Sequence, residues 1–138
     1  MREFYDQIFS QQNDCYSVVI EDDGKVAYAY LLKEEHIIGD VWLYNQAETP
    51  AEPDWTDKES LPFLNGQEFV RDNITPILNV DEVRVEWTDD LEVGGVLLYI
   101  RDQFTAKLTI NSKPGWSTNV TKDGPLARTI SKDLETHY

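Results

Sequence analysis

The chain has few of the residues that build covalent or metal-held scaffolds. It contains one cysteine, Cys15, and two histidines, His36 and His137. A single cysteine excludes an internal disulfide and any zinc site made of several cysteines, and two histidines are too few for a histidine metal cluster. The sequence therefore predicts no bound metal and no cofactor. A chain of this length buries enough surface to fold without either.

Long apolar runs are also missing. No window approaches the roughly 18 consecutive apolar residues of a transmembrane helix. The start of the chain, MREFYDQIFSQQ, lacks the apolar core of a signal peptide. The single cysteine further favours a reducing compartment. We therefore expect a cytoplasmic protein.

Basic residues are scarce relative to acidic ones. Twelve lysines and arginines stand against 26 aspartates and glutamates, which gives a net charge of −14. Nucleic acid and anionic membranes repel such a surface, so both are poor partners. A basic protein would instead be attracted and steered toward it. Solubility alone is the alternative explanation of this charge.

Hydrophobic residues, by contrast, are plentiful and are arranged mostly as strands. They make up 41% of the chain, far from the composition of disordered proteins, and the length fits one domain, residues 1–138. In VRVEWT, residues 83–88, two valines and Trp87 alternate with charged residues, which predicts one buried face. The predicted strands are residues 16–21, 25–33, 36–46, 83–88, 93–101 and 104–111.

Helical spacing is found at the two ends of the chain. The pattern FYDQIF at residues 4–9 predicts a short amphipathic helix near residues 2–12. Apolar residues spaced by four behind Pro125 predict a second helix over residues 125–135. We therefore expect an α+β fold, mainly β. Two three-stranded antiparallel meanders would form one curved sheet, a sandwich or a half-barrel, with the N-terminal and C-terminal helices closing an end.

The stretch EDDG, residues 21–24, joins the first two predicted strands. Adjacent Asp22 and Asp23, with Lys33 at the twelfth position, do not fit the calcium-binding loop of an EF-hand. Asp-Gly between alternating segments is a hairpin signal, because glycine adopts a positive φ without strain. We predict a turn.

The second and third predicted strands offer a candidate ligand face. A tight turn at residues 34–35 predicts a register in which the numbers of opposite residues sum to 69. Ala27 then lies opposite Trp42 on a shallow face, while Tyr28 and Tyr30 lie on a deep, apolar face. A partner or a sugar would bind on the shallow face, unless one of the predicted helices covers it. The residues of this candidate face are Asp40, Trp42 and Tyr44.

Acidic loops with tryptophans nearby are candidates for a protein-binding surface. Such loops occur at residues 21–23, 48–59 and 89–92, and the segment KPGWSTN carries a further tryptophan. Aromatic anchors dominate protein interfaces, and acidic neighbours would attract a basic partner. The alternative is that these tryptophans cover the core. The candidate partner-binding residues are Asp22, Asp23, Asp54, Trp55, Asp57, Asp89, Asp90 and Trp116.

Catalytic motifs are missing from the sequence. There is no serine elbow, no phosphate-binding loop and no cysteine–histidine nucleophile spacing. Asp40 and Glu86 are acids of the kind that glycosidases pair across a sheet, but the sequence does not set their separation. We therefore predict no catalytic residue.

The run YSVVIEDDGKVAYAYLL, followed by GDVWLYN and PDWTDKESLPF, resembles small single-domain bacterial proteins of an uncharacterised family. The resemblance covers about the first half of the chain and implies no site residue. In size, acidity and lack of catalytic motifs the chain is also similar to immunity proteins of bacterial toxin systems. The leading hypothesis is a non-enzymatic module that neutralises a basic toxin domain. The alternative is a small-molecule or carbohydrate binder, and the oligomeric state is left open.

Overall fold

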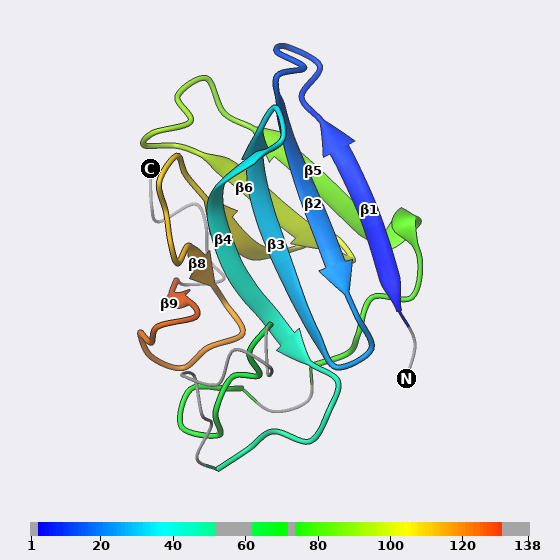
Figure 1. Cartoon of the computed structure of the whole chain (residues 1–138), viewed down its shortest axis with the longest axis vertical. Helices are drawn as coiled ribbons and strands as arrows, with labels where there is room; N and C mark the ends of the chain where they lie inside the picture. The colour runs from blue at the N-terminus through cyan, green and yellow to red at the C-terminus, as the bar shows by residue number, and fades with distance from the viewer. Residues whose placement is uncertain (1–2, 52–61, 72–73, 131–138) are drawn as a thin grey trace.

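The computed structural model describes residues 3–51, 62–71 and 74–130 (Figure 1). These residues form two β-sheets and one short 3₁₀ helix, η2 (Val80–Glu82). The first sheet has the order β1-β2-β3-β4 and the second the order β5-β6-β7-β8-β9. The strands are β1 (Phe4–Phe9), β2 (Tyr16–Asp22), β3 (Val26–Lys33), β4 (His36–Asn45), β5 (Val83–Trp87), β6 (Val96–Ile100), β7 (Gln103–Leu108), β8 (Trp116–Ser117) and β9 (Arg128–Thr129).

The two sheets lie one over the other, with β5 and β6 behind the first sheet in the view of Figure 1. Side chains from both sheets form a single hydrophobic core. Burial of this apolar surface is the main favourable term in the folding of such a chain. Fully or almost fully buried members of the core include Val18, Ile20, Ala29, Leu31, Val41, Val96, Leu98, Ala106 and Leu108.

The predicted turn at EDDG is confirmed. Gly24 has a φ of 90°, and the backbone N–H of Asp23 donates to the carbonyl of Val26 across the β2–β3 hairpin. The Asp23 carboxylate accepts hydrogen bonds from the backbone N–H groups of Lys25 and Val26, at 2.8 and 3.0 Å. Asp22 accepts one from the N–H of Gly24 at 2.9 Å. Both carboxylates therefore hold the turn.

The predicted α+β class is wrong, because no α-helix occurs among the described residues. The predicted N-terminal helix is the strand β1, which pairs antiparallel with β2 without a register shift. Phe4 is buried, whereas Tyr5 and Phe9 are exposed. The helical spacing misled because apolar residues occupy both faces of this strand, so their positions fit two periodicities at once.

The predicted C-terminal helix is also wrong over its described part, residues 125–130. Arg128 and Thr129 form β9, which runs parallel to β8. The carbonyl of Leu126 accepts a hydrogen bond from the backbone N–H of Trp42 in β4 at 3.0 Å. Long-range pairing with other strands thus overrides the local helical pattern. Residues 131–138 lie outside the described residues.

The β3–β4 hairpin begins in the predicted register, with Lys33 opposite His36. Two irregularities then shift the pairing, one at Leu31–Leu32 and one at Ala27–Tyr28. Beyond the second irregularity Ala27 lies opposite Tyr44 instead of Trp42. The predicted sum of 69 is therefore wrong away from the turn, because each bulge inserts one unpaired residue into β4.

The alanines of β3 face the second sheet, and the tyrosines face outward. Ala27 and Ala29 are fully buried in the shared core. Tyr28 and Tyr30 alternate with them and stack on one another, with ring centroids 6.0 Å apart. The Tyr28 hydroxyl donates to the carbonyl of Phe63, in the segment that follows the first sheet, at 2.7 Å. Of the two alternatives for the shallow alanine face, a surface open to a ligand is thus wrong: the face is covered, by the second sheet and not by a helix.

The two edges of the first sheet differ. The edge at β4 is covered by the chain that follows β7: Asp40 donates its N–H to the carbonyl of Ser112 at 2.9 Å, and Asn111 donates to Ile38 at 2.7 Å. At the opposite edge β1 is the terminal strand (Figure 1). Among the described residues, no helix is long and apolar enough to cross a membrane.

Candidate functional site

One wall of the candidate site is the loop between β5 and β6. Hydrogen bonds within this loop hold its conformation. The side chain of Asp90 accepts the backbone N–H of Glu92 at 2.9 Å, and its carbonyl accepts the N–H of Gly95 at 2.8 Å. The Thr88 hydroxyl donates to the carbonyl of Gly95 at 2.7 Å. Gly95 has a φ of 70°, which a residue with a Cβ adopts only with strain. The loop is thereby ordered without an apolar core of its own.

The facing wall is the turn between β1 and β2. The hydroxyl of Ser10, which is buried, accepts the backbone N–H groups of Gln12 and Asn13, each at 3.3 Å. Tyr16 donates its N–H to the carbonyl of Asn13 at 3.1 Å, and its side chain is half-buried. The turn is thus tied to the first sheet in the same way that the opposite loop is tied to the second.

Between these walls lies a groove with a volume of about 520 Å³. Trp87 at the end of β5 is half-buried and lines it, with Tyr16 from the other sheet. Three of the lining residues are acidic and none is basic. We call this feature the acidic groove. Its residues are Ser10, Gln12, Asn13, Tyr16, Trp87, Thr88, Asp89, Asp90, Leu91, Glu92 and Ile110.

Of the predicted partner-binding residues, the structure places Asp89 and Asp90 in this groove, both exposed. Asp23 is exposed at the β2–β3 turn. Asp22 is only 1% exposed, so a partner would not reach its carboxylate without opening the turn. Asp54, Trp55 and Asp57 lie outside the described residues.

Trp116 lies in β8, away from the acidic groove, and is half-buried. Cations of the chain itself lie over its ring: Arg128 at 3.9 Å and Lys107 at 5.3 Å from the ring centroid. The Arg128 guanidinium also donates to the carbonyl of Pro114, from Nε at 3.0 Å and from Nη2 at 2.6 Å. The indole thus packs with its own strand neighbours.

The candidate ligand face of Asp40, Trp42 and Tyr44 is not one surface. The bulge at Leu43 directs Trp42 to the outer face, opposite Tyr28, and Tyr44 to the inner face, opposite Ala27. Trp42 is fully buried, and its indole N–H donates to Asn45 at 2.8 Å. Asp40 is half-buried; burial raises the pKa of its carboxyl, and nearby Lys113 partly offsets this.

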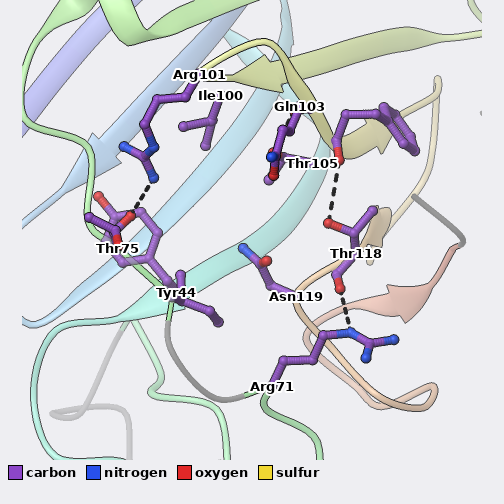
Figure 2. Close-up of a pocket in the computed structure, with 11 residues that line it drawn as sticks. Tyr44, Arg71, Thr75, Ile100, Arg101, Gln103, Thr105, Thr118 and Asn119 are labelled. Carbon is purple, nitrogen blue, oxygen red and sulfur yellow. Dashed lines mark hydrogen bonds between the residues drawn. The ribbon is translucent and has the colours of Figure 1, made fainter. Parts of the chain in front are cut away.

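Tyr44 instead lines a second cavity of about 300 Å³, between its strand and β7 (Figure 2). Arg101 at one end donates to the carbonyl of Thr75 at 2.8 Å, and Arg71 at the other end donates to that of Thr118 at 2.7 Å. Two arginines and no acid belong to its lining. Its remaining residues are Ile74, Ile100, Gln103, Phe104, Thr105 and Asn119.

Sequence reasoning missed Tyr16, Trp87, Arg71 and Arg101 as lining residues. Trp87 was predicted to face the core, and it does pack against the core while its edge lines the groove. Nothing in the sequence shows that the ends of β1 and β5 meet, because they belong to different sheets and are far apart in the chain. Only the tertiary structure brings these side chains together.

Comparison of the chain with protein-family models, with curated proteins and with solved structures found no match. Among the described residues, no group of three or more histidines, cysteines, aspartates or glutamates is arranged to hold a metal ion. The assignment of a function therefore depends on the geometry and charge of the two cavities.

Proposed function

We propose that the chain is a non-enzymatic protein-binding module that takes a basic segment of a partner protein into the acidic groove. The observation that carries this proposal is the lining of the groove, where Asp89, Asp90 and Glu92 stand beside Trp87 and Tyr16 without a basic residue. A lysine or arginine side chain would meet carboxylates and aromatic surface there, and cation–π contact adds about 0.5–1 kcal/mol at exposed sites.

Carboxylates in the groove are available to such a partner. Asp89 and Glu92 are exposed and have no ion pair with any residue that the structure describes. One carboxylate oxygen of Asp90, Oδ1, accepts the backbone N–H groups of Glu92 and Val93 within the loop. The net charge of −14 would steer a basic protein toward the molecule before contact is made.

The concrete form of the proposal is an immunity-type protein whose partner is a basic toxin domain. Its support is the similarity of the chain to immunity proteins in size, acidity and lack of catalytic motifs, together with a groove whose negative charge is complementary to a basic partner. Steered association of this kind acts mainly on the association rate and weakens as salt screens the charges.

Isothermal titration with a hexa-arginine peptide tests the groove directly. The Asp89→Asn/Glu92→Gln double variant should bind the peptide roughly fivefold more weakly than the wild type, because two exposed charge pairs are lost. A matched control removes two exposed acids elsewhere, Glu3→Gln/Glu48→Gln. An equal loss in both double variants would show that only net charge matters and would contradict a site in the groove.

A second candidate function is the binding of a small anionic molecule in the cavity of Figure 2. Its support is Arg71, in a lining that contains hydroxyl and amide groups and no carboxylate; the second arginine of the lining, Arg101, is ion-paired with Glu82. Arginine presents a planar fork of donors that matches carboxylates and phosphates. Citrate and phosphate should raise the midpoint of thermal unfolding of the wild type more than that of Arg71→Ala. An equal rise in both proteins would remove this candidate.

A further inference from the structure

Within the part of the chain that the structure describes, strand β1 leaves one row of backbone groups unpaired at the edge of the first sheet. The N–H of Ser10 donates to the carbonyl of Tyr16 at 3.0 Å, which fixes the alternation of the β1–β2 ladder. In an antiparallel pair, every second residue bonds to the neighbour and the others point away. The even-numbered residues of β1 therefore bond to β2. Residues 5, 7 and 9 direct their N–H and C=O groups to the free edge.

The same three residues direct their side chains to the outer face. Tyr5 is 59% exposed and Phe9 53%, two of the most exposed large hydrophobic residues among those described. Between them Gln7 donates from Nε2 to the hydroxyl of Ser17 at 3.0 Å. The edge therefore offers both hydrogen-bonding groups and aromatic surface to an incoming strand.

Among the common devices that protect an edge strand, β1 has only an inward-pointing charge, that of Asp6. Its sequence, FYDQIF, contains no proline and no lysine, and its pairing with β2 has no bulge. Its half-buried Asp6 is the one charged side chain on the strand. The opposite edge, at β4, is covered by the chain's own backbone. An uncovered edge of this kind is a template for another strand.

We propose that the partner at this edge is a second copy of the chain, paired antiparallel with β1 about a two-fold axis at Gln7. The numbers of opposite residues then sum to 14, so Tyr5 lies opposite Phe9 of the second copy and Gln7 opposite its own equivalent. These are the residues whose backbone groups point outward, so about six hydrogen bonds form. The contact is self-complementary, as a two-fold interface requires.

Side-chain pairing across the axis also fits. On the outer face Tyr5 of each copy lies opposite Phe9 of the other, which gives two aromatic pairs. Cross-strand aromatic pairs of this kind stabilise sheets. Asp6 lies opposite Ile8 of the second copy, so no acid stands directly opposite an acid. A strand of unrelated sequence would not reproduce this symmetry. The two first sheets become one continuous sheet of eight strands.

Charge sets the conditions under which the dimer forms. Two copies with a net charge of −14 each repel one another, and the two Asp6 carboxylates are diagonal neighbours across the axis. Salt screens this repulsion, so dimerisation strengthens as ionic strength rises. Binding of a basic segment in the acidic groove weakens under the same change. The two proposals are independent, and opposite salt responses distinguish them.

Sedimentation velocity over a range of protein concentrations tests the pairing. The wild type should show a reversible monomer–dimer equilibrium, and Asp6→Asn should strengthen it. Gln7→Pro should weaken the dimer at least about tenfold, because proline removes an outward N–H that the folded monomer does not use. Gln7→Ala is the matched control: it also removes the bond to Ser17 but keeps the N–H, so its dimer should resemble that of the wild type.

Hydrogen exchange of the wild-type protein provides a measurement that does not depend on any variant. The amide hydrogens of Tyr5, Gln7 and Phe9 should become more protected as protein concentration rises, while those of Asp6 and Ile8 are protected at every concentration. A wild type that stays monomeric up to about 1 mM, a range that includes very weak association, overturns the proposal. So does a Gln7→Pro protein that dimerises as well as the wild type, or exchange at these amides that is independent of concentration.

Discussion

The hydroxyl of Tyr44 donates to the carboxylate of Asp22 at 2.7 Å, inside the core between the two sheets. The same hydroxyl accepts the backbone N–H of Ile77 at 3.0 Å. Asp22 also accepts the N–H of Gly24 and the side-chain amide of Gln46. One buried pair thus joins the β2–β3 turn, the end of β4 and the segment that leads into the second sheet.

This network predicts a large loss of stability when Asp22 is removed. Asp22→Ala leaves three donors without their acceptor, two of them buried, and should lower the free energy of unfolding by about 2–4 kcal/mol. Tyr44→Phe leaves the Ile77 N–H without a partner and should cost about 1–2 kcal/mol. Urea unfolding of both single variants and the double variant measures their coupling. Fully additive losses would contradict a shared network.

Buried tyrosines predict a loss of stability at alkaline pH. Burial, and then the hydrogen bond to Asp22, raises the pKa of Tyr44 above its ordinary value of 10.0. Burial and the neighbouring charge of Glu21 raise the pKa of Tyr30 to about 12. A folded-state pKa above the unfolded value means that the stabilisation is complete below pH 10 and is lost as pH rises.

Urea unfolding between pH 8 and pH 11 tests this dependence. The free energy of unfolding of the wild type should fall above about pH 10, where tyrosines of the unfolded chain ionise. Tyr44→Phe should show a shallower fall, since one of the responsible groups has been removed. A wild-type stability that is flat across this range would contradict the raised pKa values.

Asp40 predicts a dependence of the same sign, at acidic instead of alkaline pH. Burial raises the pKa of its carboxyl, so the ionised form is disfavoured in the folded chain. Its raised pKa implies that the wild type gains stability, relative to Asp40→Asn, as pH falls through the folded and then the unfolded pKa. Asp40→Asn should therefore be at least as stable as the wild type at pH 7. Thermal unfolding from pH 7 to pH 3 should show this advantage disappearing.

The contacts of Arg128 predict that arginine and lysine at this position give different free energies of unfolding. Its Nε and Nη2 both donate to the carbonyl of Pro114 while the guanidinium lies 3.9 Å from the centroid of the Trp116 ring. Lysine keeps the charge but lacks the planar fork, so Arg128→Lys should lose about 1 kcal/mol of unfolding free energy. Arg128→Ala should lose more, because the stacked surface goes as well. Equal stability of wild type and Arg128→Lys would contradict a role for the fork.

The sequence predicted the negative charge of the acidic groove but not which side chains line it. The sequence places Asp89 and Asp90 in an exposed loop, because such residues favour turns over strands, and the structure agrees. That Tyr16 lies across from them depends on how one sheet packs on the other. The arginine-lined cavity gave no sequence signal, since Arg71 and Arg101 are isolated basic residues in an acidic chain.

By itself the sequence determined the local features whose cause is local. The Asp-Gly turn at residues 22–24, the alternation of β5 and a hairpin across residues 101–103 follow from backbone preferences and from a period of two. The structure makes the turn of that hairpin shorter, with Arg101 and Asp102 alone between paired Ile100 and Gln103. Arg101 and Asp102 both have positive φ in that hairpin, as a tight two-residue turn requires.

The tertiary structure alone decided the features that depend on packing. Residues 4–9 fit a helix or a strand equally well, and pairing with β2 supplied the hydrogen bonds that selected the strand. The bulge at Leu43 turned Trp42 and Tyr44 to opposite faces, because a shift of one residue reverses the direction of every later side chain. The second sheet then covered Ala27 and Ala29, since only small side chains there leave room for its own residues.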